Sequence, residues 1–130
     1  MSFLLDTNAV ISVLRGGVGL IDRVRACRPD QVCISAIVAH ELYFGAFRGV
    51  RRQANVALVD ELRFPVVEFD VDDARMSGEI RASLSAAGAT IGPYDVLIAG
   101  QALSRGLILI THDTREFSRV AGLRIEDWEA

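Results

Sequence analysis

The sequence predicts an α/β/α sandwich in which helices flank a mostly parallel sheet of about four to five short strands. Short apolar runs alternate along the chain with longer segments whose apolar residues recur at helical spacing. Hydrophobic residues make up 51% of the 130 residues and aromatic ones only 7%, which is typical of aliphatic packing between helices and a sheet. The length suits one domain with its own core, so we expect residues 1–130 to form a single domain.

The elements of the first half follow from apolar spacing and from helix-ending residues. Gly16 and Gly17 should end the first helix, and Ser35 can cap the helix that begins after it. The predicted elements are a strand over 2–5, helices over 8–15 and about 20–24, a strand over 31–35, and helices over 36–47 and about 54–62.

The second half continues the alternation. Aspartates at 70, 72 and 73 suit the positive end of a long helix, and Pro93 suits the first turn of the next one. Gly88 and Gly106 should end these two helices. The predicted elements are a strand over 64–69, helices over 71–88 and 93–105, a strand over 107–111 and a last extended piece over 123–128.

Composition excludes several classes of protein. The chain has no lysine, since all 14 basic residues are arginine, and this excludes a Walker A loop or a lysine Schiff base. The net charge of −3 argues against broad binding to nucleic acid, though not against a local basic strip. Cys27 and Cys33 lack metal-site spacing. Because no secretory signal or membrane-spanning run is visible, we expect a cytoplasmic protein with reduced thiols and no membrane association.

Fourteen of the 17 acidic residues fall into three groups. Five are expected to be solvated: Asp22, Asp60, Glu61, Glu116 and Glu129. Five fit turns and helix caps: Asp30, Asp70, Asp72, Asp73 and Glu126. Four fit neither description, because they follow apolar strands or lie in apolar helices: Asp6, Glu41, Asp95 and Asp113.

Strand direction predicts that these last four acids converge. Asp6 and Asp113 follow apolar runs, and the carboxyl ends of parallel strands meet at one edge of a sheet, where ligands bind. Asp95 opens the helix that leads back to the strand over 107–111, so it should lie at the same edge, and Glu41 joins if its helix packs there. Converging carboxylates repel one another unless a cation lies between them, and Mg²⁺ or Mn²⁺ suits oxygen ligands.

Each of these acids also has a simpler structural explanation. Asp95 can be an acid that only favours a helix start, and Asp6 can be a turn residue. Glu41 can form an ion pair with Arg48, two turns later in the same helix.

Three stretches together resemble a known family. They are "LLDTNAV", "SAIVAHELYFGA" and "IGPYDVLIAGQALSRGLILITHDTREFSRVAGLRIEDW". In this order they are similar to PIN-domain ribonucleases of the VapC toxin type, and the resemblance runs the whole length of the chain. It implies a metal-dependent endoribonuclease that hydrolyses RNA with a metal-activated water. It also implies a cytoplasmic toxin that pairs with an antitoxin protein and forms a homodimer.

The resemblance also implies roles for single residues. The catalytic and metal-binding quartet would be Asp6, Glu41, Asp95 and Asp113, with Mg²⁺ or Mn²⁺ as cofactor. Thr7, Asn8 and Thr111 would be supporting polar residues. His112 is a departure, since such toxins often carry Asn there; it is either a half-exposed loop histidine or a contact for a phosphate or a metal-bound water.

Arginines are the candidates for contacts to RNA phosphates. Arg48, Arg51 and Arg52 form a basic strip after the Glu41 helix, and Arg15 and Arg115 lie nearer the acids in sequence. The strip can equally be an ordinary charged helix face or a surface where a partner docks.

Rival functions are less consistent with the residues. Receiver domains and haloacid-dehalogenase-type phosphatases need a lysine, which the chain lacks. A PIN-like binding module without activity should have lost one or more of the four acids, and all four are present. A related metal-dependent DNA nuclease usually needs further helices to grip a duplex.

Overall fold

A computed structural model describes residues 2–129; Met1 and Ala130, the ends of the expected domain, lie outside the described residues. The elements in chain order are β1 (Phe3–Leu5), α1 (Thr7–Leu14), α2 (Val18–Arg25), the 3₁₀ helix η1 (Pro29–Gln31), β2 (Val32–Ser35), α3 (Ala36–Arg48), α4 (Arg52–Asp60), β3 (Val66–Val67), α5 (Val71–Ala86), α6 (Pro93–Ser104), β4 (Ile108–Ile110), α7 (Thr114–Phe117) and β5 (Ile125–Glu126).

The five strands form one sheet in the order β3-β2-β1-β4-β5, and every pair is parallel. In the centre, Leu5 lies opposite Ile34 on one side and Ile110 on the other. The chain first builds the sheet outward from β1 to β3 and then returns to add β4 on the other side of β1. The order therefore reverses between β1 and β4, and such a switch point leaves a crevice at the carboxyl ends of the strands.

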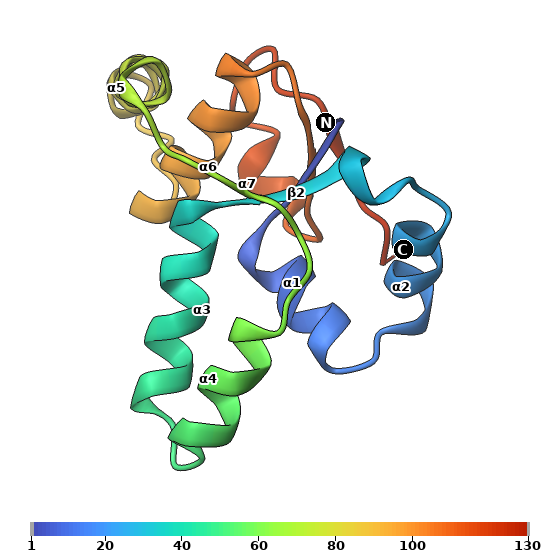
Figure 1. The fold of residues 1–130 in the computed structure, drawn as a ribbon. Helices are drawn as coiled ribbons and strands as arrows, with labels where there is room; N and C mark the ends of the chain where they lie inside the picture. The colour runs from blue at the N-terminus through green and yellow to red at the C-terminus, as the bar shows by residue number, and fades with distance from the viewer. Residues whose placement is uncertain (1, 130) are drawn as a thin grey trace.

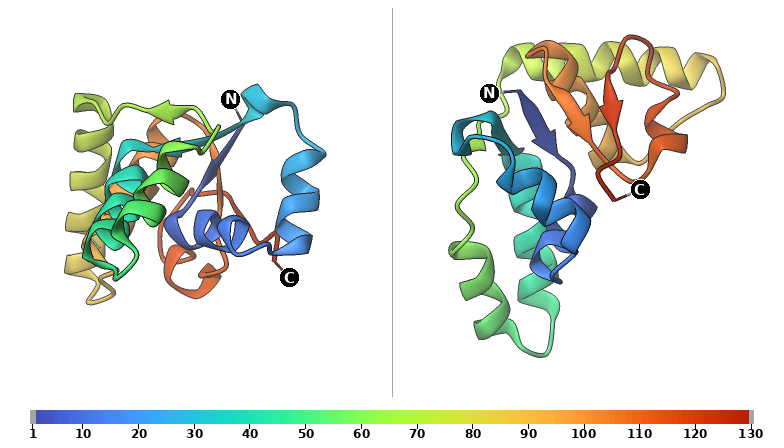
Figure 2. Two further views of the ribbon diagram at one scale, coloured as in Figure 1. Left: turned by 60° about the horizontal axis from the view of Figure 1, so that its bottom comes forward. Right: turned by 90° about the vertical axis from the view of Figure 1, so that its right-hand side faces the viewer.

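Helices flank the sheet on both sides, as expected for an α/β/α sandwich (Figure 1). In the right-hand view of Figure 2, α5 lies along the top of the molecule, and the hairpin of α3 and α4 projects downward. The core consists mainly of aliphatic side chains from the central strands and from the helices that pack on them, and Leu4 of β1, Cys33 of β2 and Leu109 of β4 are fully buried. Among residues 2–129, the structure contains no helix with the length and apolar character needed to cross a membrane.

Helix starts and ends follow the chemistry expected from the sequence. Ser35 caps α3, because its hydroxyl accepts a hydrogen bond from the Ile37 amide at 3.0 Å. Asp70 caps α5 in the same way through the Asp73 amide. Gly88 and Gly106, which follow α5 and α6, have φ of 65°, a conformation that side chains with a Cβ rarely adopt.

The structure differs from expectation in three details. The strand expected over 64–69 is only two residues long, Val66–Val67, because Pro65 has no amide hydrogen for the ladder. The helices η1 and α7 were not expected, since each is too short to show apolar periodicity. Asp73 is more than a cap: its side chain is fully buried and receives hydrogen bonds from Arg105 and Gln101.

Candidate active site

Asp6 and Asp113 lie at the point where the strand order reverses. Asp6 directly follows β1, and its amide donates to the carbonyl of Ile110, the last residue of the neighbouring β4. Each carboxylate also caps a helix: Asp6 Oδ1 accepts from the Ala9 amide at 2.8 Å, and Asp113 Oδ1 accepts from the Glu116 amide at 3.2 Å. The end of a strand and the start of a helix together hold each carboxylate in place.

Asp95 approaches the same edge from the first turn of α6. Pro93 begins this helix, and Gly92 stands at its N-cap position without a side chain. A Cβ on Gly92 would lie 3.1 Å from Asp95 Oδ2, so the glycine leaves room for the carboxylate. Asp6, Asp95 and Asp113 thus all lie at helix N-termini, where free amides and the helix dipole favour negative charge.

Glu41 reaches the site from the middle of α3. Its Oε1 accepts a hydrogen bond from the Thr7 hydroxyl at 2.7 Å, and Thr7 is the first residue of α1. The alternative ion pair with Arg48 is wrong, because the guanidinium of Arg48 instead lies over the Phe44 ring at 5.1 Å from its centroid. Thr7 therefore ties the Glu41 carboxylate to the helix that Asp6 caps.

Burial, together with the close approach of other carboxylates, raises the pKa values of Asp6 and Asp95. Burial raises the pKa of the Asp95 carboxyl to about 6. Neighbouring charges add to this rise, namely those of Glu116, Glu41, Asp6 and Asp113. Burial likewise raises the pKa of Asp6, although hydrogen bonds from the Thr111 side chain and the Ala9 amide act in the opposite direction. The site therefore carries more carboxylate charge than the hydrogen-bond donors around it offset.

Two acids expected to be solvated belong to this surface. Glu116 offers a carboxylate oxygen that lies, with one from Asp95 and one from Asp113, in a group whose members are all within 4.8 Å of one another. A hydrogen bond with Asp113, together with burial, raises the pKa of Glu116. Glu129 lies beside Asp113 in the cavity described below and contributes to the raised pKa of Asp6. A helix-start signal, Asp113 followed three residues later by Glu116, could have indicated α7 and so the place of Glu116.

The donor set fits a hard divalent cation. The three grouped ligands are all carboxylate oxygens, which Mg²⁺ and Mn²⁺ prefer over nitrogen or sulfur. None of the ion pairs among residues 2–129 brings an arginine to Asp6, Glu41, Asp95 or Asp113. A cation between them would offset the repulsion that adds to the effect of burial on the pKa of Asp95.

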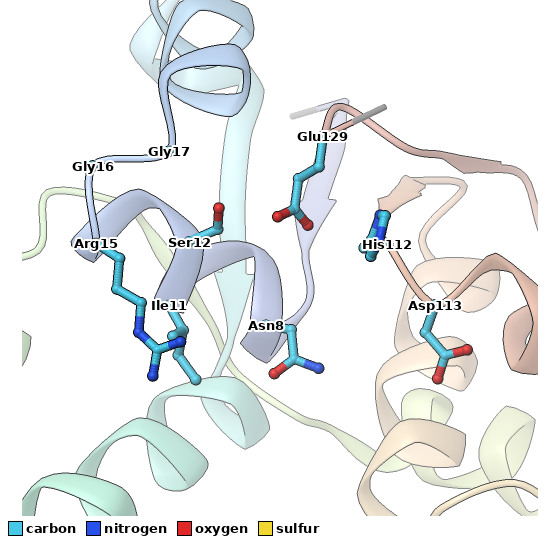
Figure 3. A pocket seen from close by; sticks show the side chains of 9 residues that line it. All are labelled: Asn8, Ile11, Ser12, Arg15, Gly16, Gly17, His112, Asp113 and Glu129. Carbon is cyan, nitrogen blue, oxygen red and sulfur yellow. The ribbon is translucent and has the colours of Figure 1, made fainter.

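A cavity of about 660 Å³ opens beside Asp113. Figure 3 shows Asn8 and Ser12 of α1, and Arg15 just after it, on one side of the cavity, facing His112, Asp113 and Glu129 on the other. The turn after α1 closes one end with Gly16 and Gly17. The cavity therefore extends from the carboxylates toward a surface with both hydrogen-bond donors and acceptors.

Comparison with known proteins agrees with this geometry. A family model of the PIN domain matches residues 3–123. The chain belongs to the PIN domain family. Its relatives include the tRNA(fMet)-specific endonuclease VapC of Salmonella typhimurium, 39% identical over 98% of each chain, and ribonuclease VapC2 of Haemophilus influenzae strain Rd, 36% identical over 98% of each chain. The resemblance to VapC ribonucleases expected from the sequence is confirmed.

The same fold is found in solved structures of VapBC complexes. The crystal structure of DNA-bound VapBC from Salmonella typhimurium matches with a TM-score of 0.93 at 38% identity, over 98% of each chain. The structure of VapBC-1 from nontypeable Haemophilus influenzae matches with a TM-score of 0.91 at 30% identity, over 100% of each chain. The expected PIN-domain sandwich is thus confirmed in both topology and overall shape.

The supporting residues of this PIN domain occupy different positions. Thr111 is buried; its side chain hydrogen-bonds to Asp6, and its Oγ1 accepts from the Asp113 amide at 2.9 Å. Asn8 is exposed on α1 and points into the cavity (Figure 3). Nδ1 of His112 donates to Asp127 Oδ2 at 2.9 Å, so this ring is oriented by a carboxylate rather than free in a loop.

The five candidate arginines do not form one surface. Arg15 lines the cavity, and Arg115 is exposed in α7 between Asp113 and Glu116. Arg48 is seven residues beyond Glu41 on α3, which corresponds to about 10 Å along a helix. The strip formed by Arg48, Arg51 and Arg52 surrounds the tip of the α3–α4 hairpin, where Arg52 Nε donates to the Phe47 carbonyl at 2.7 Å.

Proposed function

We propose that this protein is a metal-dependent endoribonuclease, the toxin of a toxin–antitoxin pair, acting as a single PIN domain over residues 1–130. The observation that carries the proposal is the convergence of four acids from distant parts of the chain, Asp6, Glu41, Asp95 and Asp113, at the switch point of the sheet. Full-length similarity to VapC ribonucleases supports the same conclusion.

The acids are proposed to hold Mg²⁺ or Mn²⁺. Asp95, Asp113 and Glu116 would supply the grouped oxygens, and Asp6 and Glu41 would complete the anionic surface. A bound divalent ion supplies a Lewis acid that makes water a better nucleophile toward phosphorus and offsets charge on the phosphate. The net reaction adds water across a phosphodiester bond and leaves a 5′-phosphate and a 3′-hydroxyl.

The other residues of the site position these acids. Thr7 holds the Glu41 carboxylate through its 2.7 Å hydrogen bond. Thr111 joins Asp6 to Asp113, because its side chain hydrogen-bonds to the first and accepts from the amide of the second. Such fixed orientation lowers the entropy lost when substrate and carboxylates are brought together.

Arginines near the cavity are proposed to hold the RNA backbone. Arg15 lines the cavity, and Arg115 lies in the short helix between two of the acids. Arg48, Arg51 and Arg52 are a second proposed contact for a longer RNA. Since the net charge is −3, binding must depend on such local contacts rather than on the field of the whole protein.

An antitoxin and a second copy of this chain are the proposed protein partners. Solved relatives are VapBC complexes. Large apolar side chains are exposed on the α3–α4 hairpin, where Phe44 is 58% and Phe47 is 52% exposed. A partner that covered these rings would remove apolar surface from water, which favours association.

Cleavage of RNA by purified, partner-free protein tests the proposal. A panel of end-labelled RNAs that includes initiator tRNA, the substrate named for the Salmonella relative, is incubated with Mg²⁺, with Mn²⁺ or with EDTA. We expect cuts that need the metal and fall at least about a hundredfold in Asp6→Asn and Asp95→Asn. Asp22→Asn, which changes an exposed acid of α2, is the matched control. Cutting that survived EDTA and both site variants would overturn the carboxylate–metal proposal.

A further inference from the structure

Apart from Asp113 and Arg15, the cavity between α1 and the C-terminal segment is lined by groups that the proposed hydrolysis does not use. It shares Asp113 with the acidic site and continues past Asn8 and Ser12 (Figure 3). Its volume of about 660 Å³ is in the range of pockets that enclose small organic ligands. A group bound here would lie directly beside a phosphate held at the acids.

One end of the cavity depends on the absence of side chains. A Cβ on Gly17 would lie 2.5 Å from Ser12 Oγ and 3.1 Å from the Ser12 carbonyl oxygen, so Ser12 would have to shift, whereas a Cβ on Gly16 would meet no atom within 4 Å. The turn can therefore pass close to the end of α1, and it leaves open space over Gly16. A flat ligand, such as an aromatic ring, can lie against the main-chain atoms of this turn.

The opposite wall is held together by Asp127. Its Oδ2 accepts from His112 Nδ1 at 2.9 Å, and its Oδ1 accepts from the Glu129 amide at 2.9 Å. The Asp127 side chain is only 19% exposed, whereas that of His112 is 66% exposed. Because Nδ1 is engaged, the ring has a set orientation, and within residues 2–129 its Nε2 makes no hydrogen bond.

The charge of this wall disfavours phosphate. Asp113 and Glu129, which line the cavity, and Asp127, which contacts His112 and Glu129, are acidic, whereas Arg15 lies on the opposite side with α1 (Figure 3). Carboxylates are, however, good acceptors for the amino groups of bases. An imidazole face is a surface on which unpaired bases stack.

We propose that this cavity receives one unpaired base of the RNA next to the cleaved phosphate, and that it favours bases with an exocyclic amino group. His112 supplies a stacking face, Glu129 accepts from the amino group, and Asp127 is a positioning residue for both. This inference rests on the proposed nuclease function and extends it to sequence preference. Uracil, which lacks an exocyclic amino group, is the base that the cavity should disfavour.

Cleavage of a single-stranded RNA library with six randomised positions tests the inference. Sequencing of the cut ends in Mg²⁺ or Mn²⁺ gives the base preference at each position around the cut. For the wild type we expect uracil to be disfavoured at one position beside the cut by about tenfold. Glu129→Gln and His112→Ala should reduce this preference at that position and leave the others unchanged. Glu79→Gln, an exposed acid on α5, is the matched control and should keep the wild-type pattern.

A binding measurement separates failure of this inference from failure of the nuclease proposal. Without divalent metal, the wild type is titrated with each of the four nucleosides, which carry no phosphate, and followed by NMR. The amides of Ser12, Gly16 and Gly17 should shift more with cytidine, adenosine and guanosine than with uridine. Equal shifts with all four, or a wild-type base preference that persists in Glu129→Gln, would overturn the inference. This holds whether or not any RNA is cut.

Discussion

Some residues of this PIN domain stabilise a helix and also form part of the proposed active site. Asp6 caps α1 through the Ala9 amide and also faces the other carboxylates. Thr7 begins that helix and donates to Glu41. An acid that only capped a helix would gain from the dipole, whereas burial leaves the pKa of Asp6 raised. A divalent cation, as proposed above, would favour the ionised form of Asp6.

Glu116 gives a prediction at this scale. Glu116→Gln keeps the size of the side chain but removes one anionic oxygen from the group shared with Asp95 and Asp113. We expect Mn²⁺ affinity, measured by calorimetry, to fall by about tenfold, and cleavage to fall with it at limiting metal. Glu61→Gln, an exposed acid after α4, is the control. Unchanged affinity in Glu116→Gln would show that this carboxylate is only a neighbour of the metal ligands.

Helices and strands were predictable where local chemistry determined them. Ser35 and Asp70 marked helix starts, and the apolar run over 107–111 marked β4. Asp6 and Asp113 could be paired because both follow strands of one sheet. Glu116 could not be separated from solvated acids by composition, because its position depends on the turn of α7 that brings its amide to Asp113.

The buried role of Asp73 was hidden for a different reason. Its partner Arg105 lies 32 residues later, at the end of α6, and no local pattern joins the two. Arg105 Nη2 donates to Asp73 Oδ2 at 3.0 Å and to the Glu68 carbonyl at 2.9 Å. This ion pair holds the start of α5 to the end of α6 and to the loop after β3.

The Asp73–Arg105 pair predicts a pH-dependent contribution to stability. Burial alone would raise the pKa of Asp73, but hydrogen bonds from Arg105, the Asp70 amide and Gln101 outweigh it and lower the pKa below 3.8. Since the folded state binds the proton less well, this stabilisation is present above about pH 4 and is lost as the pH falls through the lowered pKa.

Asp73→Asn tests this contribution. It removes the buried partner of Arg105, which keeps only the more exposed Asp70 carboxylate at 3.3 Å and the Glu68 carbonyl, so we expect a loss of about 2 kcal/mol in the free energy of unfolding at pH 7, from urea denaturation. The difference from wild type should shrink below pH 4. Asp72→Asn changes an exposed acid in the same first turn and should cost well under 1 kcal/mol. A loss of equal size at pH 3 and pH 7 would exclude the ion pair as its cause.

At the scale of the whole molecule, the fold assembles repelling charges. Residues 6, 41, 95 and 113 come from nearly the whole length of the chain and meet only when the sheet, α3 and α6 are in place. Folding without metal therefore brings together carboxylates that are far apart in the unfolded chain. A ligand that binds only the folded site should add stability according to its concentration and affinity.

Asp95→Asn separates the cost of bringing the carboxylates together from the stability that a bound metal ion adds. The pKa of Asp95 is raised to about 6, so its ionised form destabilises the metal-free fold at pH 7.5. In EDTA at that pH we expect the variant to be more stable than wild type by about 1 kcal/mol, which allows for solvent screening. As the pH falls below 6, the folded protein takes up a proton at Asp95, so the advantage should shrink and be gone near pH 4. With Mg²⁺ or Mn²⁺ the order of stability should reverse, because only the wild type keeps the full set of ligands.

The control variant Asp22→Asn should show neither change. An Asp95→Asn variant that gained as much stability from the metal as the wild type would place the cation elsewhere.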